Sequence, residues 1–93
     1  MERAIFVAVI SKNTTEDQVN EYLDELEFLA ETDGCIGLKR FTQKLDAPLS
    51  STYVGSGKLK EIAEYVAENE ISTIIFDDEL SPSQLRNLER ELV

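Results

Sequence analysis

The sequence predicts an α/β fold, with a small parallel sheet of three strands and helices packed on it. Three apolar segments rich in β-branched residues alternate with three segments of helical period. The resulting order, strand-helix-strand-loop-helix-strand-helix, favours right-handed crossovers and a parallel sheet. With 93 residues, the chain is expected to form one domain at most.

Three segments are expected to form the strands. Residues 4–10 are continuously apolar, and a run without alternation is typical of a strand covered on both faces. The second strand is expected over residues 35–43, and the third over residues 72–76. Helices are therefore expected on both sides of the first strand.

Helical periodicity places the first helix after a polar turn and ends it near Thr32, where Asp33-Gly34 stops it. The second helix covers about residues 57–69, and the third follows Ser81. The residues expected on the buried faces are Val19, Tyr22, Leu23, Leu26, Leu29 and Ala30 in the first helix and Leu85, Leu88 and Leu92 in the third. Phe28 falls among acidic side chains, so we expect it to be exposed.

Polar residues ahead of two helices are candidates for capping them. The candidate pairs are Asn13 with Glu16 or Thr14 with Asp17 for the first helix, and Ser81 with Gln84 for the third. Pro82 suits the first helical position, since its missing N–H would have no partner there. The start of the third helix is thus marked by three separate signals.

A loop over residues 44–51, then a short extended piece over residues 52–54, leads to a glycine turn ahead of the second helix. Gly55 and Gly57 can take a positive φ or let another group approach the backbone closely. The first N–H groups of a helix lack intrahelical partners and carry the positive end of its dipole. The candidate anion- or phosphate-binding residues are therefore Gly55, Ser56, Gly57 and Lys58. The alternative is a tight turn in which Ser56 is the helix N-cap.

This turn is not a Walker A loop. Thr52 stands where that motif has its first glycine, and Leu59 stands where it has the Ser or Thr that binds Mg²⁺. The chain has no histidine, and no nucleophile is accompanied by a base and an orienting group, so no catalytic residue is assigned. The acids of residues 77–79 could hold Mg²⁺, but acids ahead of a helix are favoured by its dipole anyway, so no metal site is assigned.

The net charge of −10 argues against non-specific nucleic-acid binding by the domain as a whole. Its one basic segment covers residues 39–60, which carry Lys39, Arg40, Lys44, Lys58 and Lys60 against Asp46. The alternative reading of this segment is an ordinary solvated surface. A single cysteine, the absence of an apolar run of about 18 residues and an acidic N-terminal flank lead us to expect a cytoplasmic protein without a membrane-spanning segment.

Two segments carry a family resemblance. Residues 52–58 read Thr-Tyr-Val-Gly-Ser-Gly-Lys, and residues 76–84 read Phe-Asp-Asp-Glu-Leu-Ser-Pro-Ser-Gln, continuing through Arg-Asn-Leu-Glu at 86–89. Together they resemble the N-terminal domain of the HflX family of translational GTPases, and the likeness spans nearly the whole chain. The resemblance implies that residues 1–93 are one α/β domain of a longer protein, without the strand that follows in the family.

Further expectations come from this resemblance alone. It implies a GTPase parent, with GTP and Mg²⁺ bound by a GTPase domain and no hydrolysis by this fragment, which lacks the Walker A and N-K-x-D motifs. It implies binding to the large ribosomal subunit and splitting or rescue of stalled ribosomes. The candidate ribosomal-RNA contacts are then Lys39, Arg40, Lys44, Lys58 and Lys60. The alternatives are a nucleotide (ATP)-binding module that uses the glycine turn, or a purely structural scaffold. A sheet short of one strand would leave an edge open, so a weak homo-oligomer is also expected.

Overall fold

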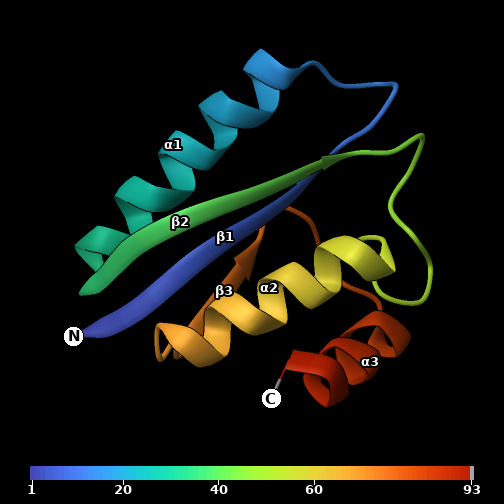
Figure 1. The fold of residues 1–93 in the computed structure, drawn as a ribbon. Coiled ribbons are helices and arrows are strands. Elements are labelled where there is room, and N and C mark those ends of the chain that lie inside the picture. Colours follow the sequence, from blue (N-terminus) through green and yellow to red (C-terminus); the bar gives the residue numbers. More distant parts are fainter. Residues whose placement is uncertain (93) are drawn as a thin grey trace.

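The structure, a computed structural model, describes residues 1–92 and confirms the predicted α/β fold (Figure 1). Its elements are β1 (Glu2–Ile10), α1 (Glu16–Thr32), β2 (Cys35–Lys44), α2 (Ser56–Glu68), β3 (Thr73–Phe76) and α3 (Pro82–Leu92). The three strands are parallel, in the order β2-β1-β3. The observed strand and helix ends lie within two residues of the sequence predictions.

The central strand β1 separates two apolar layers. Residues 4–10 are all buried, as their continuous apolar run predicts. Ile5, Val7 and Val9 pack with residues of α2 and α3, whereas Phe6, Ala8 and Ile10 pack with residues of α1. Figure 1 shows the same division, with α1 on one face of the sheet and α2 and α3 on the other. This arrangement follows from the pleat, because successive side chains of a strand point to opposite faces.

One extra residue in β2 shifts its register against β1. Ala4 pairs with Gly37, but Ile5 pairs with Lys39, so Leu38 is left over. Gly37 faces α1, and a Cβ atom placed on it would lie 2.9 Å from Phe6 Cε2 and 3.1 Å from Glu27 Cγ. This bulge and this glycine therefore let α1 approach the sheet closely.

The cap of the third helix is confirmed, and that of the first is not the one predicted. Ser81 Oγ accepts from the Gln84 N–H at 3.1 Å, and Gln84 Oε1 accepts from the Ser81 N–H at 2.9 Å. At the first helix the same reciprocal pair is made by Thr15 and Gln18. Asn13 and Thr14 are not caps, because Thr14 instead closes the preceding turn by bonding back to Ser11.

The predicted buried faces are correct in part. Val19, Leu23, Ala30 and Leu88 are buried, and Phe28 is 60% exposed as expected. Three residues assigned to buried faces are instead partly exposed: Tyr22 at 46%, Leu29 at 62% and Leu85 at 48%. Tyr22 and Leu29 lie on the flank of α1 opposite to Glu27, and Leu85 lines an open apolar cavity beside β3.

Candidate functional site

The glycine turn shows one of the two uses of glycine that the sequence suggested, a close approach to the backbone, and not the other, a positive φ. Neither Gly55 nor Gly57 takes a positive φ; among residues 1–92 the only glycine that does is Gly34, which follows α1 with φ of 91°. Gly55 is the N-cap of α2 and has an extended backbone, with φ of −65° and ψ of 160°. Ser56 is already the first helical residue, so its prediction as the N-cap is wrong.

Gly55 permits the close approach that was predicted as the second use of these glycines. Its N–H donates to Gln43 Oε1 at 2.8 Å, and a Cβ atom on Gly55 would lie 3.2 Å from Gln43 Nε2. The Gln43 side chain, from the end of β2, thus satisfies an N–H ahead of α2 that would otherwise face an incoming anion.

The first turn of α2 remains open beyond this contact. Ser56 and Gly57 are exposed, and no atom lies within 4 Å of a Cβ placed on Gly57. The turn contains no acidic residue to offset the helix dipole. Lys58, however, is paired with Glu61 at 3.2 Å, and only 23% of its side chain is exposed. The four predicted anion-site residues are therefore close together, but their lysine is already partly neutralised.

Tyr53 is a central residue of the site that the sequence analysis missed. Its backbone is left-handed, with φ of 70°, so residues 52–54 are not the extended piece that was predicted. Its N–H and C=O both bond with Leu49, which closes a tight turn. Its side chain is 2% exposed and packs edge-to-face on Phe76, with ring centroids 5.4 Å apart. A bulky residue with positive φ is unfavourable on its own. The burial of the Tyr53 side chain therefore offsets this backbone strain.

The Tyr53 hydroxyl ends at the carboxyl end of β3. It donates to Asp77 Oδ1 at 2.6 Å. Burial raises the pKa of the Tyr53 hydroxyl, and the neighbouring Asp77 carboxylate raises it further. Burial also raises the pKa of Asp77, and the hydrogen bond from Tyr53 partly opposes this. No local sequence signal joins two residues 24 positions apart, which is why this pair was not predicted.

This pair occupies the position where a sheet of this order would hold a ligand. With strands in the order β2-β1-β3, successive connections run in opposite directions, and such folds bind ligands at the carboxyl ends of β1 and β3. The Tyr53 ring fills that region with the protein's own side chain. Asp78 caps the Glu79 N–H at 3.0 Å, and within residues 1–92 no three acidic, cysteine or histidine side chains are placed to hold a metal ion.

Side chains of α3 hold the loop that carries Tyr53. Gln84 Nε2 donates to the Leu49 carbonyl at 2.8 Å, and Asn87 Nδ2 donates to the Ser51 carbonyl at 2.9 Å. The resemblance-carrying segments 52–58 and 76–84 therefore meet in space, since one supplies Tyr53 and the other Asp77 and Gln84.

The five basic residues of 39–60 do not share one surface. Lys39 lies over the rings of Phe41 and Tyr65, at 5.1 and 5.3 Å from their centroids, on the α2 face of the sheet. Arg40 points to the other face, as strand alternation requires, and bonds with carboxylates of α1 at 2.7 Å (Asp24) and 3.0 Å (Glu27).

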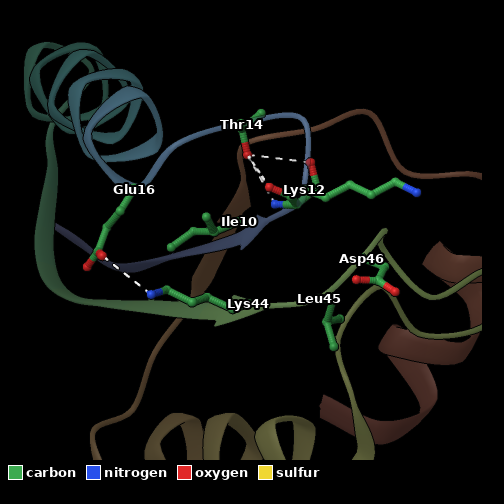
Figure 2. Close-up of a pocket in the computed structure, with 8 residues that line it drawn as sticks. Ile10, Lys12, Thr14, Glu16, Lys44, Leu45 and Asp46 are labelled. Carbon is green, nitrogen blue, oxygen red and sulfur yellow. Dashed lines mark hydrogen bonds and ion pairs between the residues drawn. The ribbon is translucent and has the colours of Figure 1, made fainter.

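Lys44 and Lys60 occupy two further places. Lys44 pairs with Glu16 at 3.7 Å beside a shallow cavity of about 620 Å³ at the carboxyl ends of β1 and β2. Figure 2 shows this pair on one side of the cavity and the Lys12 side chain pointing away on the other. Lys60 is exposed and lines a second cavity of about 630 Å³ with Arg90, between α2 and α3. The hydroxyl-bearing residues of that cavity are Ser51, Thr52 and Ser56.

Comparison with known proteins identifies the family of this chain. Residues 20–93 match the family model described as GTP-binding GTPase N-terminal. The chain belongs to this family.

Several relatives of this N-terminal domain are named GTPase HflX, which confirms the resemblance. The relative from Flavobacterium psychrophilum is 51% identical over 89 residues, covering 96% of this chain and 22% of the relative. The relative from Lacrimispora saccharolytica is 42% identical (98% of this chain, 21% of the relative), and that from Escherichia coli K12 is 40% identical (96% and 20%). The chain thus spans about a fifth of the length of these relatives.

None of the helices in residues 1–92 has the length and apolar character that a membrane-spanning helix needs.

Proposed function

We propose that this chain is the N-terminal accessory domain of a GTPase that binds the large ribosomal subunit and helps to split or rescue stalled ribosomes. Membership of the GTP-binding GTPase N-terminal family and the names of the relatives support a GTPase parent. The parent would bind GTP and Mg²⁺ in a separate domain and act in the cytoplasm. The ribosomal role is carried over from the HflX resemblance of the two segments that meet at Tyr53.

An accessory rather than a catalytic role is supported by one observation: the usual ligand position, at the carboxyl ends of β1 and β3, is filled. Tyr53 closes the region at the ends of β1 and β3, and Gln43 occupies the Gly55 N–H. A fold that fills its usual ligand position with its own side chains is suited to presenting a rigid surface. The expectation that follows is that the chain alone does not hydrolyse GTP. GTP turnover that follows the pure chain and disappears in Gly57→Ala would contradict it.

Contact with ribosomal RNA is proposed to run through the basic segment, with unequal weights. Lys60 leads, because it is exposed beside Arg90 and three hydroxyl-bearing residues. Lys39, Lys44 and Lys58 can contribute if they exchange an aromatic or carboxylate partner for phosphate. Arg40 contributes least, since two carboxylates of α1 already hold it. Arg40 is therefore expected to stabilise the fold more than it contacts RNA.

Binding of a full-length relative to purified large ribosomal subunits tests this proposal. Changing the residues equivalent to all five to alanine should weaken binding and lower the salt slope, because phosphate contacts release counterions. A second variant keeps Arg40 and changes only the four lysines, so that a stability defect is not mistaken for lost binding. Lys12→Ala with Arg86→Ala is a control that removes two positive charges elsewhere, to be compared with a variant that changes only Lys58 and Lys60. Unchanged affinity and salt slope in the four-lysine variant would contradict the proposed contact.

The second candidate is a nucleotide (ATP)-binding module, favoured by the open first turn of α2. Ser56 and Gly57 are exposed there, and no acid offsets the dipole. Equilibrium dialysis of the chain with labelled ATP, for the wild type and for Lys58→Ala, tests this candidate. Binding that Lys58→Ala removes would favour it. Absence of both nucleotide and ribosome binding would leave the third reading, a scaffold that positions the rest of the parent.

A further inference from the structure

The outer surface of α1 is acidic along its whole length. The helix has seven acidic residues and no basic one among its 17 residues: Glu16, Asp17, Glu21, Asp24, Glu25, Glu27 and Glu31. Arg40 neutralises Asp24 and Glu27, and Lys44 lies beside Glu16. Within residues 1–92, the other four carboxylates have no ion-pair partner, so α1 keeps a strong negative field toward solvent.

Large apolar side chains are exposed within this acidic surface. Phe28 and Leu29 are 60% and 62% exposed, and Tyr22 is 46% exposed. Phe28, Leu29 and Glu25 line a shallow depression of about 350 Å³. Positions three and four apart are neighbours on a helix, so Tyr22, Glu25 and Leu29 form a continuous patch. Exposed apolar surface bordered by polar side chains is a feature of interaction sites.

The patch adjoins the part of the sheet that α1 leaves uncovered. α1 packs mainly on β1 and β2, and Figure 1 shows it as the only helix of residues 1–92 on this face. Arg40 ties the Glu27 flank of α1 to β2. At 100° per residue, Tyr22 and Leu29 lie on the opposite side of the buried stripe, toward β3. There Ile75 packs against the α1 layer but is only partly buried.

We propose that this face of α1, with Tyr22 and Leu29 on the side toward Ile75, Phe28 on the solvent side and Glu21 and Glu25 between them, is a docking surface for a basic amphipathic helix of a protein partner. The apolar side of such a helix covers the exposed apolar side chains of α1 and the partly buried Ile75. Its lysine and arginine side chains meet the unpaired carboxylates, which is the charge complementarity of helix-in-groove recognition. Phosphates of RNA and a second acidic copy of this chain are both repelled by the same carboxylates. This inference goes beyond the proposed ribosomal function and does not depend on it.

Titration of the chain with a designed helical peptide of about 18 residues tests the surface, with leucine on one face of the peptide and lysine on the other. Amide NMR shifts are expected to concentrate over residues 21–32 and at Ile75. In fluorescence anisotropy, Phe28→Ser with Leu29→Ser should weaken binding about tenfold or more, since apolar anchors dominate such interfaces. Circular dichroism of the double variant checks that α1 remains helical.

Matched controls separate this site from general attraction to an acidic protein. Leu85→Ser on α3 removes a similarly exposed leucine and should leave the affinity unchanged. Glu21→Gln with Glu25→Gln should weaken binding more than Glu64→Gln with Glu68→Gln on α2. A scrambled peptide of the same composition should bind much more weakly. Equal binding of the scrambled peptide, shifts centred away from α1, or tighter binding of single-stranded RNA or of a second copy at this face would each overturn the proposal.

Discussion

The Tyr53 hydroxyl and the Asp77 carboxylate are 2.6 Å apart and join the loop before α2 to the end of β3. In this position Tyr53 has a left-handed backbone, a conformation that a bulky residue adopts only when its surroundings impose it. Those surroundings are the Phe76 ring and the Leu49 backbone. The pair therefore holds in place the turn from which α2 and its exposed first residues begin.

Replacing Tyr53 by phenylalanine tests this role. Tyr53→Phe keeps the ring but removes the donor to a half-buried carboxylate, so we expect a loss of about 1–2 kcal/mol in the free energy of unfolding near pH 7. Urea denaturation measures it. Tyr65→Phe is the control, since this ring also packs edge-to-face, on Phe41. An equal effect of both changes would show that the Asp77 contact contributes nothing specific.

The same substitution should change the pH dependence of stability. Burial raises the pKa of Asp77 in the folded state, so this carboxyl favours the folded state most when protonated. Its contribution falls as the pH rises from the unfolded value of about 3.9 through the higher folded value. Tyr53→Phe removes the bond that opposes the shift, so the Asp77 pKa should rise further. The stability gap to wild type should then be small at about pH 3 and larger at about pH 7. An NMR titration of the Asp77 carboxyl carbon would contradict this if its pKa fell in the variant.

Two glycines should respond in opposite directions to alanine. Gly37→Ala places a Cβ atom 2.9 Å from Phe6, which is fully buried and cannot move away. We expect a loss of about 1–3 kcal/mol, because α1 must shift from the sheet. Gly57→Ala meets open space inside a helix and should gain about 0.5–1 kcal/mol. Thermal unfolding of both variants is the measurement, and a neutral Gly37→Ala would mean that α1 is not held tightly at the bulge.

Arg40 should behave as a structural residue. Arg40→Ala removes hydrogen bonds to Asp24 and Glu27 and leaves both carboxylates without their partner, so we expect a loss of about 0.5–1 kcal/mol. Lys60→Ala, in an exposed position, should leave the free energy of unfolding unchanged. Raising the salt concentration should shrink the Arg40 effect. A loss in Lys60→Ala as large as in Arg40→Ala would contradict the division between the two residues.

Much of the fold could be predicted because its signals are local. The sequence signals for β1, its apolar run, and for the start of α3, Ser81-Pro82 with Gln84, each lie within a few residues. The cap at Thr15 with Gln18 carries the same kind of signal, but neighbouring residues offered equally good patterns. The exposure of Tyr22 and Leu29 could not be predicted, because a helical stripe shows which side faces the sheet but not how wide the sheet is.

The site was harder to predict than the fold, for a related reason. The glycine turn could be predicted, but the sequence does not show that the Gly55 N–H would donate a hydrogen bond to the Gln43 side chain. The Tyr53–Asp77 pair depends on the strand order, which brings the ends of β1 and β3 beside the loop. Likewise, Lys39 and Arg40 are adjacent in sequence and so resemble one basic patch, yet the pleat of β2 sends them to opposite faces.

The two outer edges of the sheet differ in how they resist pairing with another molecule. The outer edge of β2 carries lysines and the bulge at Leu38, both of which discourage strand addition. The edge of β3 has neither, and it lies beside an apolar cavity of about 430 Å³. The apolar residues of that cavity are Val66, Ile71, Ile74, Phe76, Leu80, Leu85, Leu88 and Leu92. Self-association of this chain is therefore expected at β3.

Sedimentation equilibrium over a salt series tests this expectation. The net charge of −10 opposes association at low salt, but the repulsion is screened within about 8–10 Å near physiological ionic strength. Strand pairing and apolar burial act only at contact, so weak association should strengthen as salt rises. Leu85→Lys places a charge on the open side of the cavity without touching the core and should keep the chain monomeric. Leu29→Lys, which adds the same charge on α1, should leave association intact. A strict monomer at high concentration and moderate salt, or equal loss in both variants, would show that β3 is not the associating edge.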